Sequence, residues 1–238
     1  MTAAGGPVIP NFGRASSCVL ENRTFCWGWA KQHWGDTLGP ALAQHLELTA
    51  IAVGIGFALA FGLALLAHRV RAVEQPVSIL SALLYTIPSL ALFQLLVPFT
   101  GITTTTIEIA LVAYTLVILF PNIVAGLRSA PPEVLEAARG MGLTRRQTLA
   151  RVELPLAVPT IIGGLRIAVV STISIATIAA FLMPKGLGHP ILFALAEPHP
   201  FKTEIYASGV LAVGLALACD AALLLLRRAL APWAQRGQ

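Results

Sequence analysis

The sequence PPEVLEAARGMGLTRRQTLARVELP, residues 131–155, is a polar segment between two long apolar runs. The two prolines at its front suit the first turn of a helix, and the acidic Glu133 follows where the helix dipole favours negative charge. Gly140 and Gly142 predict that this helix ends within about three turns. The segment therefore predicts a short helix that begins near Pro132.

A second short helix should follow the glycine turn. Thr144 offers its hydroxyl as the N-cap, and Gln147, three residues later, completes a capping box. Pro155 should end or kink this second helix. The predicted product is a helix, a glycine turn and another helix, which together carry Arg139, Arg145, Arg146 and Arg151.

This segment resembles the signature loop of permease subunits of ATP-binding cassette (ABC) importers, usually written E-A-A, three residues, G, nine residues, I-x-L-P. The spacing matches throughout, and the only departure is Val152 in place of Ile. The matched positions are Glu136, Ala137, Ala138, Gly142, Val152, Leu154 and Pro155. The resemblance implies that residues 128–155, the coupling loop, lie in the cytoplasm and dock on an ATPase. The small Ala137 and Ala138 suit close approach to that partner, and Glu136 can pair with a basic residue.

Two plainer interpretations of the arginine-rich loop compete with coupling. A helix, a glycine turn and a helix also occur in DNA readers, but those proteins carry a third supporting helix, and both flanks here become apolar within a few residues. Basic loops also anchor membrane proteins by the positive-inside rule, which is compatible with coupling but does not explain the spacing. The sequence therefore predicts no nucleic-acid partner.

The composition is that of an integral membrane protein with a lipid bilayer as its partner. Of 238 residues, 56% are hydrophobic and 11% are charged, and the mean hydropathy is +0.78. A soluble domain of this length is not so apolar. Residues 1–45 lack a basic start followed by an apolar core, so we expect no cleavable signal peptide and insertion directed by the first span.

Five apolar stretches are long enough to cross about 30 Å of hydrocarbon. The predicted fold is all-α and polytopic, with spans at about 46–67, 77–99, 107–127, 156–182 and 206–226. These spans make up a permease domain, 46–230. The predicted flanking parts are an extracytoplasmic or interfacial tail, 1–45, and a cytoplasmic tail, 231–238. Three tryptophans in the first tail suit the headgroup region of a bilayer.

The basic residues predict the orientation. With the N-terminus outside, the cytoplasmic side holds ten: Arg69, Arg71, Arg128, Arg139, Arg145, Arg146, Arg151, Arg227, Arg228 and Arg236. The outer side then holds five: Arg14, Arg23, Lys31, Lys185 and Lys202. The positive-inside rule therefore favours N-out and C-in, which also places the coupling loop in the cytoplasm.

Polar positions within the spans are candidates for a translocation path. The second span is interrupted at Thr86-Ile87-Pro88-Ser89, which predicts a structural kink or, less favoured, contact with substrate. In the fourth span, Ser171, Ser174, Ile178 and Phe181 recur every three or four residues, so they share one face that we expect to point into the bundle or a cavity. The candidate path residues are Tyr85, Pro88, Ser89, Ser171, Ser174 and Phe181.

Two further pairs are singled out by position. Arg166 and Asp220 lie inside the fourth and fifth spans, where an unpaired charge is costly, so we expect a structural ion pair rather than a role in transport. Cys18 and Cys26 can form a disulfide if the N-terminal tail is outside the cell. Cys219 is expected to be a small packing residue, and no histidine cluster completes a metal site.

The resemblance also implies partners. No Walker A sequence, G-x-x-x-x-G-K-[ST], occurs, so we expect this chain to be no enzyme and to bind no cofactor, with ATP and Mg²⁺ held by a separate ATPase. Membership of the ABC family implies the type I importer permease fold in the cell membrane. It also implies a second permease chain, identical or paralogous, and an extracytoplasmic substrate-binding protein.

The substrate is predicted from further likeness to one branch. Residues 85–92, residues 151–157 and Gly186-Leu187-Gly188 are similar to permeases for osmoprotectants such as glycine betaine, choline or carnitine, although Met183-Pro184-Lys185 departs from that pattern. Quaternary amines are held over aromatic faces, for which the candidates are Tyr85, Phe93, Tyr114 and Phe181. The alternatives are a permease for methionine or another amino acid, an ion-coupled secondary transporter with Arg166, Asp220 and Glu108 as relays, and a membrane regulator that transports nothing.

Overall fold

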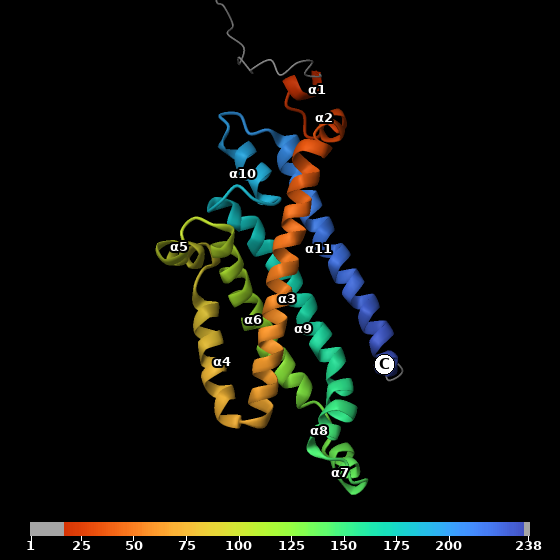
Figure 1. Ribbon diagram of the computed structural model, residues 1–238. Coiled ribbons are helices and arrows are strands. Elements are labelled where there is room, and N and C mark those ends of the chain that lie inside the picture. Colours follow the sequence, from red (N-terminus) through yellow and green to blue (C-terminus); the bar gives the residue numbers. More distant parts are fainter. Residues whose placement is uncertain (1–16, 236–238) are drawn as a thin grey trace, which may run out of the picture.

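The computed structural model describes residues 17–235, and these form helices joined by short turns, without a strand among them. Four long helices run along the length of the molecule: α3 (Gly39–Arg69), α6 (Thr104–Leu127), α9 (Leu154–Ile178) and α11 (Lys202–Leu230) (Figure 1). The coupling loop lies at the lower end of this bundle in Figure 1, and the first described residues lie at the upper end. The two ends are therefore far apart.

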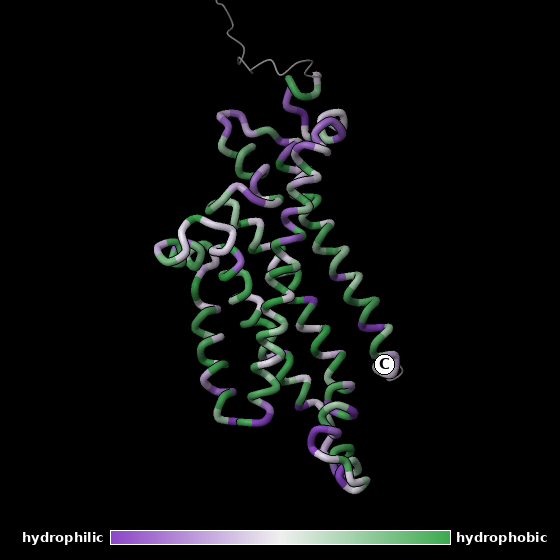
Figure 2. The backbone as a smooth tube through the Cα atoms, viewed as in Figure 1, coloured by the Kyte–Doolittle hydropathy of each residue, from purple (hydrophilic) through white to green (hydrophobic). Residues whose placement is uncertain are grey.

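Four of the five predicted spans are confirmed as single helical stretches. The stretches long and apolar enough to cross a membrane are Trp34–Arg69, Thr104–Leu127, Arg145–Phe181 and Lys202–Leu230. Apolar residues follow the lengths of these helices, and hydrophilic residues gather at the lower tip and the upper end (Figure 2). The fifth span exists only if two bent helices, α4 (Arg71–Thr86) and α5 (Ser89–Thr100), count as one.

The break between α4 and α5 is sharper than the predicted kink. The two helices are bent by 104°. Pro88 lacks an N–H and disfavours helical geometry at Ile87, which is extended with φ −77° and ψ 123°. The freed Ile87 carbonyl accepts a hydrogen bond from the Tyr114 hydroxyl of α6, which holds the turn in place.

The N-terminal part is more helical than expected. Two short helices, α1 (Ser17–Leu20) and α2 (Trp27–Gln32), and a π-helical turn η1 (Trp34–Leu38) lead into α3. Because α3 already begins at Gly39, the tail boundary predicted at residue 45 falls inside a helix. Residues 1–16 and 236–238, which include Arg14 and Arg236, lie outside the described residues.

The core is built where α3, α6 and α9 meet. Small residues allow this close approach: a Cβ on Gly56 of α3 would lie 2.6 Å from Thr115 of α6, and one on Gly164 of α9 would lie 2.5 Å from Asn122 of α6. Thr115 and Thr172 join α6 to α9 through a hydrogen bond of 3.1 Å between their hydroxyls. These three packed helices form the core from which the coupling loop projects.

The remaining elements cover only parts of this core. Along the most apolar window of α11 no residue is buried, and its buried residues, Thr203, Ala207 and Ser208, lie at its upper end. A short helix, α10 (Gly188–Ala196), packs at the upper end beside α11 and the 3-10 turn η3 (Ala179–Phe181). With 9 residues it is too short to span a membrane.

Candidate coupling site and translocation face

The first half of the coupling loop folds as the sequence predicts. Helix α7 (Pro132–Gly140) begins at the second proline and ends in a glycine turn, where Gly142 has φ +78°. The Gly142 N–H donates to the Arg139 carbonyl at 2.9 Å, and the Leu143 N–H donates to the Ala138 carbonyl at 3.1 Å. This is the Schellman arrangement, which requires a left-handed residue at the position of Gly142.

The predicted capping box is also confirmed. The Thr144 hydroxyl accepts from the Gln147 N–H at 3.4 Å, and the Gln147 side chain accepts from the Thr144 N–H at 2.8 Å. The helix that follows does not end at Pro155, however. Helix α8 (Arg145–Thr148) passes through a π-helical turn, η2 (Leu149–Glu153), directly into α9. Pro155 lies in the first turn of α9, where its missing N–H is tolerated, and the π-helical turn absorbs the change.

The matched residues of the coupling loop divide into an exposed group and a packed group. Glu136, Ala137 and Gly142 are exposed. Ala138 is 1% exposed, because it packs against its own chain, so the expectation that it approaches a partner is wrong. The last three, Val152, Leu154 and Pro155, are half-buried. They join the loop to the bundle.

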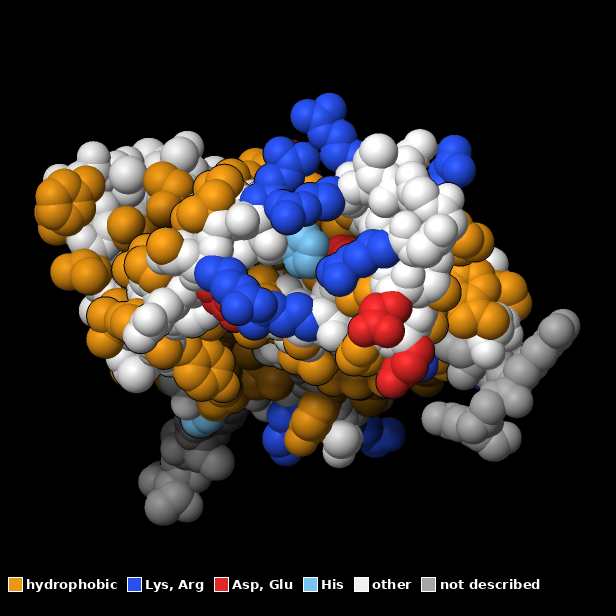
Figure 3. All heavy atoms as spheres, turned by 90° about the horizontal axis from the view of Figure 1, so that it is seen from below, with side chains coloured by type: hydrophobic (Ala, Val, Ile, Leu, Met, Phe, Trp, Pro, Cys, Tyr) orange, Lys and Arg blue, Asp and Glu red, His pale blue; other side chains and the backbone are white. Residues whose placement is uncertain are grey.

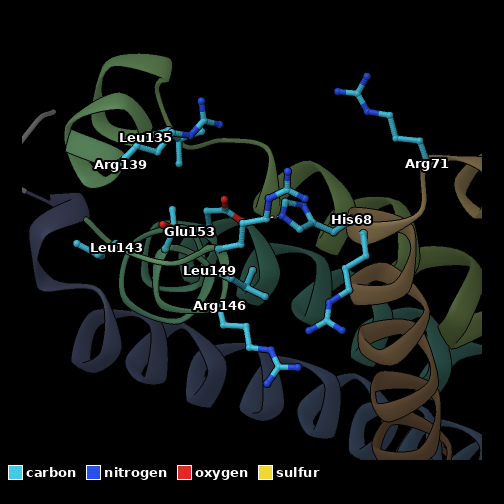
Figure 4. Close-up of a pocket in the computed structure, with 11 residues that line it drawn as sticks. His68, Arg71, Leu135, Arg139, Leu143, Arg146, Leu149 and Glu153 are labelled. Atoms are coloured by element: carbon cyan, nitrogen blue, oxygen red, sulfur yellow. Dashed lines mark ion pairs between the residues drawn. The ribbon is translucent and has the colours of Figure 1, made fainter. Parts of the chain in front are cut away.

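A cavity lies beside the coupling loop, between the α3–α4 corner and the α7–α8 corner. Its volume is about 1160 Å³, and its lining combines basic and apolar side chains. His68 from the end of α3 faces Glu153 at 2.8 Å. Viewed from below, blue Lys and Arg side chains gather on this end of the molecule (Figure 3), and the close-up shows Arg71 and Arg139 on opposite sides of the cavity (Figure 4).

The candidate path residues lie on the outside of this chain. Tyr85 is 69% exposed and Phe181 is 63% exposed, Pro88 and Ser174 are exposed, and Ser89 and Ser171 are partly exposed. The face of α9 and η3 that packs into the bundle consists of other residues: Thr172, Ile173, Ala176 and Ala179. Of the two expected surroundings for the serine face, this chain's own bundle is not the one it meets, and a cavity shared with a second chain stays a prediction. Periodicity identifies a face but not what covers it.

The expected pair between α9 and α11 is present. The Arg166 guanidinium donates two hydrogen bonds to the Asp220 carboxylate, from Nε to Oδ1 and from Nη2 to Oδ2, both at 2.7 Å. The two side chains are 29% and 30% exposed in the single chain. This bidentate ion pair connects the largely exposed α11 to α9 of the bundle.

At the upper end, Cys18 and Cys26 form a disulfide bond. The small cap that it closes is held on the start of α11: the Cys26 N–H donates to the Thr203 hydroxyl at 2.9 Å, and the Asn22 side chain bonds the Pro200 carbonyl and the Lys202 N–H. Cys219 is a free, partly buried cysteine, as predicted.

A buried histidine at the upper end was missed by sequence reasoning. His45 of α3 accepts a hydrogen bond from the Leu187 N–H at 3.2 Å, and its other ring nitrogen donates to the Ile173 carbonyl at 3.0 Å. The neighbouring Gln44 accepts from the Gly186 N–H at 3.1 Å. The signal was the polar pair Gln44-His45 in front of an apolar run, but the partners of this pair are 128 and 142 positions away.

Helical spans joined by a loop that projects from one end define a polytopic membrane protein. Residues 50–236 match the family described as "Binding-protein-dependent transport system inner membrane component", and the chain belongs to this family. It is thus a multi-pass inner-membrane protein and the permease subunit of an ABC importer, a family whose permeases work with ATPase and substrate-binding partners.

Named relatives and a solved structure agree with this assignment. The chain is 41% identical over 150 residues to the osmoprotectant import permease OsmW of Salmonella typhimurium, covering 61% of this chain and 70% of the relative. It is 34% identical over 194 residues to the carnitine transport permease OpuCB of Listeria monocytogenes, covering 81% and 88%. The methionine ABC transporter MetNI in an inward-facing conformation matches with a TM-score of 0.72 at 21% identity, over 81% of this chain and 95% of that chain.

Proposed function

We propose that this permease takes up osmoprotectants of the quaternary-amine type, such as glycine betaine, choline or carnitine. The observation that carries the proposal is the 41% and 34% identity to permeases named for osmoprotectant and carnitine transport. The likeness to the methionine transporter is only 21% identical and concerns the fold alone, so methionine is the weaker candidate.

The coupling loop supports a docking role for the exposed side of α7. Glu133, Glu136 and Ala137 are exposed at the tip of the molecule, where an ATPase can reach them. In this proposal the loop is cytoplasmic, ATP and Mg²⁺ are bound by the ATPase, and this chain binds no cofactor and hydrolyses nothing. The substrate-binding protein approaches the opposite end, where the disulfide-closed cap lies.

A second permease chain, identical or paralogous, completes the translocation path. The exposed stripe on α9 and the following turn η3 consists of Ile167, Val170, Ser174 and Phe181, so a hydroxyl and an aromatic ring lie on a face that this chain leaves open. Hydrocarbon offers a hydroxyl no hydrogen-bond partner, whereas a passage between two chains offers it a partner in water, in a solute or on the second chain. Tyr85 and Phe181 are then available to contact a quaternary ammonium.

Uptake into proteoliposomes tests this function. The permease is reconstituted with its ATPase and binding protein, ATP is supplied on the ATPase side, and labelled glycine betaine, choline, carnitine and methionine are compared. We expect ATP-dependent uptake of at least one quaternary amine and none of methionine. Uptake driven by an ion gradient without ATP would contradict the mechanism, and uptake of methionine alone would contradict the substrate class.

A further inference from the structure

The cavity beside the coupling loop carries more positive charge than the chain itself balances. Its lining residues are His68, Arg69, Arg71, Leu135, Arg139, Leu143, Arg145, Arg146, Thr148, Leu149 and Glu153. The single carboxylate, that of Glu153, faces His68 at 2.8 Å. Within residues 17–235, none of the five lining arginines has a carboxylate within 4 Å.

Five guanidinium groups around one hollow create a strongly positive potential. They come from separate elements: Arg69 and Arg71 from the α3–α4 corner, Arg139 from α7, and Arg145 and Arg146 from α8. Holding like charges together is unfavourable unless an anion sits between them. Arginine forms bidentate hydrogen bonds with phosphate, so phosphate is the anion that this lining suits best.

The depth of the cavity indicates where such a phosphate comes from. Arg69 is the last residue of α3, directly after an apolar run long enough to span, so this wall stands where hydrocarbon gives way to headgroups. The cavity is also lined by leucines: Leu135, Leu143 and Leu149. Free phosphate has no apolar part that could contact these leucines, whereas a phospholipid has its glycerol and upper acyl carbons.

The proposed ATPase surface leaves this cavity open. On α7, Leu135 and Arg139 are one turn apart and both line the cavity. Glu133 and Ala137 are likewise one turn apart, but they do not line it and are exposed. One helix therefore presents an acidic, small-residue side to an ATPase and a basic side to the cavity, so both surfaces can be occupied together.

We propose that the cavity is a binding site for an anionic phospholipid of the same membrane leaflet, whose phosphate bridges the α3–α4 corner and the coupling loop. The headgroup phosphate lies among the arginines, and the leucines contact the apolar part of the lipid. By binding both corners, the lipid fixes the position of the coupling helix α7 relative to the bundle. This inference is independent of which solute is transported.

Lipid titration of the purified permease–ATPase complex, and of the permease without the ATPase, tests the site. Short-chain phosphatidylglycerol, phosphatidylcholine and inorganic phosphate are titrated separately in a neutral detergent, with the apparent Kd and the melting temperature as readouts. The pocket variant is Arg69→Gln/Arg71→Gln. Its matched control is Arg227→Gln/Arg228→Gln, which removes the same charge from the last turn of α11, outside the cavity.

We expect phosphatidylglycerol to bind more tightly than the other two probes and to raise the melting temperature. Two lost charges should weaken its binding roughly ten- to thirtyfold in the pocket variant and leave the control unchanged. If the pocket variant does not fold, the proposed site is tested by whether the wild-type complex binds phosphatidylglycerol more tightly than phosphatidylcholine.

Three results would overturn the inference. The first is equal binding of phosphatidylglycerol and phosphatidylcholine, and the second is equal binding of inorganic phosphate, which would make the site one for free anions. The third is binding that is lost when the ATPase is attached, which would mean that the ATPase fills the cavity. None of these bears on substrate uptake, so the site and the proposed function fail separately.

Discussion

Gly186 shows how one residue closes the upper end of the molecule. It has φ +69°, and a Cβ at this position would lie 2.9 Å from Nδ1 of His45. The same histidine nitrogen accepts the N–H of Leu187. A side chain here would therefore strain the backbone and push away the group that holds the next residue.

The first prediction is that Gly186→Ala lowers stability by about 1–3 kcal/mol. Thermal unfolding of the purified protein measures the change. Gly214→Ala on α11 is the control, because a Cβ there meets nothing within 4 Å. We expect the control to match wild type or exceed it slightly, since alanine favours a helix. Equal melting of both variants would show that the contact with His45 is unimportant.

The second prediction concerns the pair between Arg166 and Asp220. Asp220→Asn leaves a guanidinium in the membrane without its carboxylate, whereas Arg166→Met/Asp220→Leu removes both charges. We expect the single variant to melt at a lower temperature than the double variant. A double variant as unstable as the single one would indicate that the residues matter separately and not as a pair.

At the scale of elements, the turn between α4 and α5 depends on a neighbouring helix. An X-Pro step predicts a break, and the sequence revealed it at Pro88. The angle of 104° was not predictable, because it depends on where α6 places the Tyr114 hydroxyl that binds the Ile87 carbonyl. Local sequence determines that a helix stops, and packing determines the direction in which the chain continues.

The third prediction follows from this hydrogen bond. Tyr114→Phe removes the donor and leaves the Ile87 carbonyl without its partner, which should cost about 1–3 kcal/mol of stability. Tyr114 is 7% exposed, so water replaces the hydroxyl poorly. Tyr85→Phe is the control, because Tyr85 is largely exposed. Similar losses in both variants, by chemical denaturation, would refute the role assigned to Tyr114.

The fourth prediction concerns the glycine turn of the coupling loop. Gly142→Asp places a charged side chain at a left-handed position on the surface proposed for ATPase docking. We expect the variant to insert normally into the membrane and to lose ATP-dependent uptake. Gly140→Ala, which lies in α7 with open space around its Cβ, should retain uptake. Normal uptake by Gly142→Asp would count against the coupling assignment.

Sequence reasoning was most successful where the determinants are local. The start of α7 near Pro132 and the capping box of Thr144 and Gln147 both follow from neighbouring residues, and both are confirmed. Spans were located because the apolar content of a segment is also local. The buried side of Ala138 and the contacts of His45 were missed, because they depend on residues brought together only by the fold.

At the scale of the whole molecule, the serine-bearing face of α9 and most of α11 are surfaces that this chain alone leaves uncovered. The sequence predicted that Ser171 and Ser174 share a face. It could not predict that this face points outward, because that depends on how α9 packs in the fold. The basic residues of the α3–α4 corner, the coupling loop and the end of α11 gather at one end of the bundle, which agrees with a single cytoplasmic side (Figure 1).

The fifth prediction tests that arrangement, on which ATP-driven transport depends. In a Cys219→Ala background, Arg146→Cys on the coupling loop and Lys202→Cys at the opposite end are labelled with a membrane-impermeant thiol reagent. We predict that Lys202→Cys is labelled in intact cells, whereas Arg146→Cys is labelled only after the inner side of the membrane is opened. Labelling of Arg146→Cys in intact cells would place the coupling loop beyond the reach of any cytoplasmic ATPase and would contradict the account.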